Sequence, residues 1–429
     1  MKNRIQELKN FYILWSTQSL SQLGSTITSF ALTLWLYQKT GSALQTALLS
    51  ICSYAPYVIM SIFAGALSDK WNKKRTMLAC DTLAACSTVI VLFMLQTDLL
   101  RPWHLYLLNA ISGLMNTVQN PASEVAITLI TPKDQYQRTS GLRSFSRSLI
   151  TILHPVIATA LWGIGGMHIV IAVDLSTFAI AFLSLWLLVR IPETIAADEN
   201  DAQETLLASA RAGLLCLKEN KLVLYLILFL SGVNLVASAF DAVLPAFILP
   251  HTGGGEKVLG FVMSFAGIAM LIGSLLATVL PTPKDRIKVI ILTMLFSLTA
   301  DNFLMAMTNN PALWCLAQIF GYLPVPLMET NLDVIVRSSI SDRMQGRVYA
   351  CRNTLQFFTI PVGLFFGGFM VDTICEPYMA GTENRLLLSC FGQEKGSGAA
   401  MVIFLLGIMG CIVCLSFGTI LKKYKYQDQ

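Results

Sequence analysis

Charged residues are scarce in this sequence. Asp, Glu, Lys and Arg together make up 13% of its 429 residues, whereas hydrophobic residues make up 55%. Soluble globular proteins carry about a quarter of their residues as charged side chains. The shortage therefore predicts a protein that lies in a membrane.

The sequence also lacks groups that most enzymes and ATP-driven pumps need. It contains no GxxxxGK[ST] motif, the loop that holds nucleotide phosphates, so we expect any transport to draw its energy from an ion gradient. Its four histidines are dispersed, no His, Asp and Glu cluster marks a membrane enzyme, and no repeated filter marks a channel. We therefore expect neither an enzyme nor a bound cofactor or metal.

No disulfide framework is indicated. Eight of the ten cysteines lie in or beside apolar runs, where a thiol packs as a small hydrophobe. The N-terminus carries Lys2, Arg4 and Lys9, but the apolar run that follows is long and lacks a small-residue cleavage site. We expect the first helix to be retained rather than removed as a signal peptide.

Apolar runs of about 20 residues, the length that crosses a bilayer, recur along the chain. They lie at 11–36, 44–68, 76–97, 103–130, 139–163, 166–190, 221–249, 258–280, 288–308, 311–336, 349–374 and 398–421. The prediction is an all-α integral membrane protein with twelve transmembrane helices.

The basic residues are distributed unevenly between the loops. With a cytoplasmic N-terminus, all but five of the 30 Lys and Arg residues fall on the cytoplasmic side, the exceptions being Lys39, Arg101, Lys257, Arg385 and Lys395. Cytoplasmic loops carry this excess. We expect both termini in the cytoplasm and the chain in the inner (plasma) membrane, with no nucleic-acid partner.

A polar stretch at 192–220 divides the chain into halves of similar size. Its second part, 208–219, is amphipathic and is expected to lie along the membrane surface. The halves repeat weakly, because Pro121 and Glu124 match Pro326 and Glu329 at one offset. We predict two pseudo-repeated six-helix bundles, 1–191 and 221–429, joined by a linker at 192–220.

The stretch GALSDKWNKKR, residues 65–75, is the polar hinge between the second and third runs. It resembles the loop pattern Gly-x-x-x-Asp-Arg-x-Gly-Arg-Arg/Lys of the major facilitator superfamily. Four residues match the pattern: Gly65, Asp69, Lys73 and Lys74. Lys70 stands where the family has Arg, and Asn72 stands where it has Gly. Because Asn enters the left-handed region readily, we expect the tight turn to survive there.

Further stretches along nearly the whole chain resemble the macrolide-efflux branch of that superfamily. They include QLGSTITSFAL, KTGSA, NPA, TPKDQYQRTSGL, AVDLSTFAIAFLSL, ENKLV, GIAMLIGSLLA, SDRMQGRVYA and PVGLFFGGFMVD. The resemblance implies a monomeric secondary transporter that exports hydrophobic drug-like compounds in exchange for protons by alternating access. The expected partners are therefore a small-molecule substrate, protons and the lipid bilayer. The alternatives are the same fold moving a lipid, siderophore or nutrient, or, less favoured, a polytopic membrane enzyme.

Ionisable groups in the apolar runs are candidates for proton coupling, because each costs about 2.5–3.5 kcal/mol on insertion scales. Glu124 and Glu329 occupy equivalent places in the repeat, and we predict that they carry protons. The alternative is a hydrogen-bonded carboxylate near each helix end. Asp333 either shares the proton of Glu329 or, as we favour, pairs with Arg337 at the next i+4 step.

Other polar residues are predicted to meet the substrate or to hold the structure. Asp241 is expected to be a counter-ion for a cationic drug, or else a polar contact near the outer mouth. Amides in lipid need partners, so six are predicted to face the substrate path: Gln18, Gln22, Asn116, Gln119, Asn234 and Gln356. Acids near outer helix ends are expected to be structural: Asp174, Asp301 and Asp372.

Gating is predicted for the hinge residues Gly65, Asp69, Lys70, Lys73 and Lys74, and for Arg347 in the family-like stretch SDRMQGRVYA. Asp69 is expected to attract the N-terminal end of the eleventh helix, or else to pair locally with a hinge base. Four arginines near cytoplasmic helix ends are expected to anchor those ends, with gating as the alternative. They are Arg143, Arg147, Arg337 and Arg352.

Overall fold

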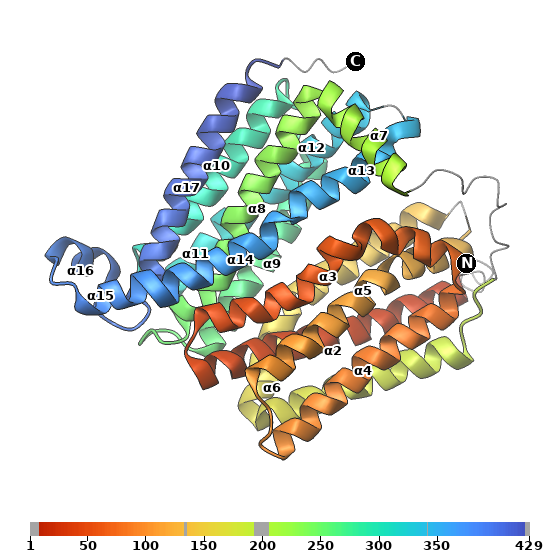
Figure 1. Cartoon of the computed structure of the whole chain (residues 1–429), viewed down its shortest axis with the longest axis horizontal. Coiled ribbons are helices and arrows are strands. Elements are labelled where there is room, and N and C mark those ends of the chain that lie inside the picture. The colour runs from red at the N-terminus through yellow and green to blue at the C-terminus, as the bar shows by residue number, and fades with distance from the viewer. Residues whose placement is uncertain (1–7, 133–134, 193–205, 341, 425–429) are drawn as a thin grey trace. The chain divides into compact units, whose positions relative to one another are not determined.

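The computed structural model describes residues 8–132, 135–192, 206–340 and 342–424, which form helices, turns and loops without a strand (Figure 1). The first long helices are α2 (Lys9–Thr40), α3 (Ala43–Lys70), α4 (Lys73–Gln96), α5 (Pro102–Ile130) and α6 (Tyr136–Leu187). They are followed by α7 (Leu206–Glu219), α8 (Lys221–Ile248), α9 (Glu256–Val279) and α10 (Arg286–Ala306). The last are α11 (Pro311–Tyr322), α12 (Val325–Ser339), α13 (Asp342–Phe357), α14 (Thr359–Phe369), the π-helix η3 (Met370–Cys375), α15 (Glu376–Gly381), α16 (Arg385–Phe391) and α17 (Ser397–Leu421).

The expected apolar runs are found as helices. Nine stretches of the described chain are long and apolar enough to cross a membrane. One of them lies in α6, which contains two of the expected runs separated by a kink where Gly166 has φ +61°. Counting the halves of α6 separately, and adding α2 and α5 for the runs at 11–36 and 103–130, accounts for the twelve predicted helices.

Two of the expected helices are interrupted. The run predicted at 311–336 divides into α11 and α12 at Leu323 and Pro324, because proline lacks the N–H that would continue the ladder. The run predicted at 349–374 divides into α13, α14 and η3. An interruption of this kind leaves backbone N–H and C=O groups without their helical partners. It also changes the direction in which the following side chains point. The break between α11 and α12 directs Tyr322 and Glu329 toward one cavity, which is described below.

The chain separates into two compact units. The first contains residues 1–35 and 52–205, and the second contains residues 36–51 and 206–429. The core of the first unit forms where α2 packs against α4, α5 and α6. Its buried residues are Leu8, Phe11, Leu14, Met77, Ala122, Ala126, Ile130, Leu185 and Val189. The small Ala122 and Ala126 lie one turn apart on one face of α5, which leaves room for the larger side chains of α2.

In the second unit, α8 packs against α14 and α17, and α10 packs against α11, α12 and α17 (Figure 1). The helices α8 and α14 approach so closely that their backbones are nearly in contact. A Cβ placed on Gly363 would lie 2.1 Å from Ser238 Oγ, and one on Gly367 would lie 2.4 Å from the carbonyl oxygen of Ala239. Glycine is therefore required for these two helices to approach so closely.

Replacing Gly367 with Ala is expected to destabilise the protein by about 1–3 kcal/mol, because the added methyl group forces α14 away from α8. The thermal unfolding midpoint of the purified protein in detergent would measure the loss. Gly381→Ala in α15 is the matched control, since a Cβ there would meet nothing within 4 Å. Equal midpoints for the two variants would contradict the inferred tight packing.

Residues 36–51, the tip of the hairpin between α2 and α3, are fixed to the second unit by polar contacts. Asp372 of η3 accepts hydrogen bonds from the Ser42 hydroxyl at 2.5 Å and from the backbone N–H groups of Ala43 at 3.0 Å and Leu44 at 2.9 Å. These are groups at the N-terminal end of α3, so Asp372 caps that helix. The expectation of a structural role for Asp372 agrees with this contact.

Candidate functional site

The hinge at 65–75 has a different geometry from the one predicted. Asn72 has φ −63° and ψ 116°, which is extended rather than left-handed backbone, and its Oδ1 accepts the backbone N–H of Arg75 at 3.1 Å. The prediction of a left-handed turn at Asn72 is therefore wrong. Asn replaces the family's glycine by acting as the N-cap of α4.

The two described lysines of the hinge hold backbone carbonyls of the first unit. Lys73, which is buried, donates from Nζ to the carbonyl of Trp71 at 3.1 Å. Lys74 donates to the carbonyls of Trp186 at 3.0 Å and Val189 at 2.8 Å, where α6 ends. A cation at a helix C-terminus stabilises that end. The side chains of the other predicted gating residues, Gly65, Asp69, Lys70 and Arg347, lie outside the described part of the structure.

Glu124 of α5 is tied to two arginines of α6. Its carboxylate forms a bidentate pair with the guanidinium of Arg143, with Arg143 Nη1 at 2.7 Å from Oε2. Arg147 Nη2 lies 3.4 Å from Oε1. This is the alternative considered for Glu124, a carboxylate held by hydrogen bonds, and it gives Arg143 and Arg147 a partner as well as a place at a helix end.

The partner of Asp333 differs from the one favoured by the sequence. Asp333 Oδ1 lies 2.9 Å from Nη1 of Arg352 on α13, whereas the i+4 rule favoured Arg337. Arg352 also donates from Nε to the side-chain oxygen of Gln356 at 3.2 Å. The break between α11 and α12 and the approach of α13 bring these residues together, so a contact between helices replaces the local pair.

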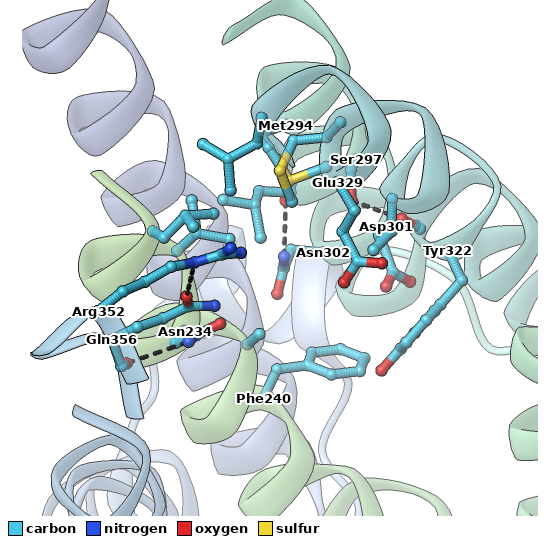
Figure 2. A pocket seen from close by; sticks show the side chains of 18 residues that line it. Asn234, Phe240, Met294, Ser297, Asp301, Asn302, Tyr322, Glu329, Arg352 and Gln356 are labelled. Carbon is cyan, nitrogen blue, oxygen red and sulfur yellow. Dashed lines mark hydrogen bonds between the residues drawn. The ribbon is translucent and has the colours of Figure 1, made fainter. Parts of the chain in front are cut away.

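A cavity of about 170 Å³ lies within the second unit, among α8, α10, α11, α12 and α13. Figure 2 shows its polar and aromatic lining: Asn234, Phe240, Met294, Ser297, Asp301, Asn302, Tyr322, Glu329, Arg352 and Gln356. The rest of the lining is largely aliphatic, with a second methionine, Met328. An apolar cavity with a few convergent polar groups is typical of a small-molecule site.

Glu329 differs from the other two predicted coupling residues. It lines the cavity, and in the described part of the chain its carboxylate forms no hydrogen bond or ion pair. Arg352 lines the same cavity but is engaged by Asp333. Glu329 is therefore an acid of the cavity that no hydrogen bond or ion pair among the described residues holds, with Asp333 and Arg352 as its charged neighbours.

The remaining polar groups of this cavity are partly satisfied. Asn234 donates to the backbone carbonyl of Gln356 at 3.1 Å, and both residues line the cavity. Gln318 donates to Asp301 Oδ1 at 3.4 Å. The side-chain oxygen of Asn302 is buried and has no partner among the described residues. Sequence reasoning assigned Asp301 a structural role and missed Asn302, although adjacent Asp and Asn in an apolar run were a usable signal.

Asp241 lies next to this cavity rather than in its lining. Its side chain is exposed, and its Oδ1 is 3.5 Å from the hydroxyl of Tyr322, which does line the cavity. Tyr322 therefore contacts both the cavity and Asp241, the acid predicted to meet the substrate.

The four predicted amides of the first unit do not all lie at one site. Gln18 and Gln119 both donate to Asp81, at 3.1 Å to Oδ2 and 2.6 Å to Oδ1. Asn116 lines a second, polar cavity that also contains Asp81, whereas the Gln22 side chain is exposed. The rule that amides need partners pointed to Gln18, Gln119 and Asn116, but the sequence analysis did not single out Asp81, which accepts hydrogen bonds from Gln18 and Gln119.

The comparisons with known proteins agree with this architecture. The chain matches the family model described as the Major Facilitator Superfamily over residues 14–364. Macrolide efflux protein A of Streptococcus pyogenes is 25% identical over 384 residues, which cover 88% of this chain and 92% of that protein. The multidrug efflux pump Tap of Mycolicibacterium fortuitum is 23% identical over 363 residues, or 81% of this chain and 85% of Tap.

Solved structures show the same fold at lower identity. A mutant of the nucleoside transporter NupG matches with a TM-score of 0.72 and 14% identity, covering 96% of this chain and 99% of NupG. A bacterial homolog of the human lysosomal transporter Spinster matches with a TM-score of 0.70 and 14% identity, covering 96% of each chain. The predicted fold and family resemblance are confirmed. Since the family model spans most of the sequence, the chain belongs to the Major Facilitator Superfamily.

Proposed function

We propose that this transporter exports hydrophobic, drug-like compounds across the plasma membrane in exchange for protons, by alternating access. The observation that carries the proposal is the cavity of the second unit. Its aliphatic and methionine lining suits varied apolar molecules, because Met side chains adapt their shape. Similarity to macrolide efflux protein A and to Tap supports a drug-like substrate.

Acidic groups in and beside this cavity favour cationic members of that class. Glu329 forms no hydrogen bond or ion pair among the described residues, and Asp241 is exposed beside Tyr322. A cation that enters the cavity would lie close to these carboxylates. When Glu329 releases its proton, its carboxylate becomes negatively charged and can bind the cation. Competition between substrate and proton for one carboxylate is a physical basis for exchange.

Export is tested in cells that express the protein. They are expected to accumulate less ethidium or labelled macrolide than cells with an empty vector, and a protonophore is expected to remove the difference. Equal accumulation with and without expression would contradict the drug-export proposal. A difference that survives the protonophore would contradict the proton as the driving ion, and transport of a lipid, siderophore or nutrient instead would retain the family but change the substrate.

A further inference from the structure

The polar cavity of the first unit, of about 160 Å³, lies among α2, α3, α4, α5 and α6. Hydroxyl groups are its most common polar lining. They belong to Ser21, Ser25, Thr28, Ser29, Ser53, Ser87, Thr88 and Ser112. Two carboxylates, Asp81 and Asp174, and two amides, Asn109 and Asn116, complete the polar lining, and none of the described lining residues is Lys, Arg or His. The drug-export proposal gives this cavity no task.

The two carboxylates differ in how well they are satisfied. Both oxygens of Asp81 accept amide hydrogens, from Gln18 and Gln119. Asp174, which is 5% exposed, has only hydroxyl donors: Ser25 Oγ at 3.1 Å from Oδ1 and Thr88 Oγ1 at 3.4 Å from Oδ2. Thr88 Oγ1 is also 3.4 Å from the carbonyl of Ala84, so its proton is shared between two acceptors and its bond to Asp174 is weak.

A second observation points to a missing occupant. Thr28 is 6% exposed and lines the same cavity as Asp174. Yet its hydroxyl has no hydrogen-bond partner among the described residues. Burying a hydroxyl without a partner costs free energy. We therefore expect an occupant of the cavity, such as a cation, to contact the Thr28 oxygen.

The backbone around Asp174 is tightly held. A Cβ placed on Gly24 would lie 2.3 Å from Thr177 Oγ1 and 3.2 Å from Asp174 Cα, so α2 and α6 touch at this glycine. Because Ser25 and Thr28 follow Gly24 on α2, the close contact fixes both hydroxyls relative to the carboxylate. The oxygen atoms are therefore arranged by rigid helices rather than by loops.

We propose that this cavity binds one sodium ion, held by the Asp174 carboxylate and by the hydroxyl oxygens of Ser25, Thr28 and Thr88. Carboxylate and hydroxyl oxygens are hard ligands that suit a hard cation. A single carboxylate ligand matches a single positive charge, whereas a divalent ion would call for a second carboxylate within ligand distance. Asp81 does not supply it, because it is occupied by two amides and lies on α4 about two turns, or ~10 Å, before Thr88.

Sodium binding is tested on the purified full-length protein in detergent, without any drug. Radioactive sodium is expected to bind with a stoichiometry of one ion per chain, and NaCl is expected to raise the thermal unfolding midpoint above that in choline chloride of equal ionic strength. Asp174→Asn is expected to abolish both effects. Thr28→Val, which keeps the charge and the shape, is expected to weaken sodium affinity roughly tenfold or more.

Thr26→Val is the matched control. Thr26 lies on the same helix, but its hydroxyl is bonded to the backbone carbonyls of Gln22 and Leu23 and does not line the cavity. Wild-type sodium affinity in Thr28→Val, or equal stabilisation by sodium and choline, would overturn the proposal. Wild-type affinity would mean that Thr28 is no ligand of the ion, and equal stabilisation would mean that Asp174 is neutralised by a proton alone. Because no drug is present, this failure is distinguishable from failure of the proposed export.

Discussion

An Asp372→Asn protein is expected to lose the cap on α3, and the backbone amides of residues 43–45 are expected to exchange with solvent roughly thirtyfold faster. The carboxylate of Asp372 accepts three hydrogen bonds from Ser42, Ala43 and Leu44. Its charge also favours the positive end of the helix, which is worth up to about 2 kcal/mol in partly buried sites. Hydrogen-exchange mass spectrometry of the purified protein would measure the change.

Two further variants separate the charge from the contacts. Ser42→Ala keeps the carboxylate and removes one of its three donors, so we expect an intermediate rate of exchange. Glu383→Gln is the control, because it removes an exposed acid of the same unit. If exchange at residues 43–45 is the same in Asp372→Asn and in Glu383→Gln, the cap does not hold the hairpin tip.

The helices and the family could be predicted from the sequence because both depend on local pattern. An apolar run of about 20 residues has few fates other than a membrane helix, and the run boundaries agree closely with α4, α5 and α17. The hinge pattern at 65–75 predicted membership of the Major Facilitator Superfamily, and the family model confirms it. Even the wrong detail, Asn72 as a left-handed residue rather than a cap, came from choosing between two local preferences of the same side chain.

The partners of the acids could not be predicted, because they lie on other helices. Asp333 has Arg337 one turn away on its own helix but pairs with Arg352, which is distant along the chain. Glu124 and Glu329 occupy equivalent positions in the repeat, yet only Glu124 meets the two arginines of α6. Repeat symmetry therefore predicts the place of a residue in its helix and not its electrostatic surroundings, which depend on what the neighbouring helices present.

Replacing Glu329 with Gln is expected to lower export driven by a pH gradient by roughly tenfold or more, while an uncharged substrate still binds. Glutamine keeps the size of the side chain but cannot release a proton, and Glu329 is the predicted coupling acid that lines the cavity without a partner among the described residues. The measurement is uptake of a fluorescent substrate into sealed inverted vesicles with an imposed pH gradient, together with substrate binding to the purified protein.

Glu124→Gln is the matched comparison, because it makes the same chemical change at the equivalent place in the repeat. It leaves Arg143 without its bidentate partner, so we expect a lower unfolding midpoint but unchanged dependence on the pH gradient in the protein that folds. The opposite pattern, with gradient dependence kept in Glu329→Gln and lost in Glu124→Gln, would move the coupling site to the first unit. That result would mean that the ion pair of Glu124 with Arg143 opens during transport and that its proton, rather than that of Glu329, is exchanged for the substrate.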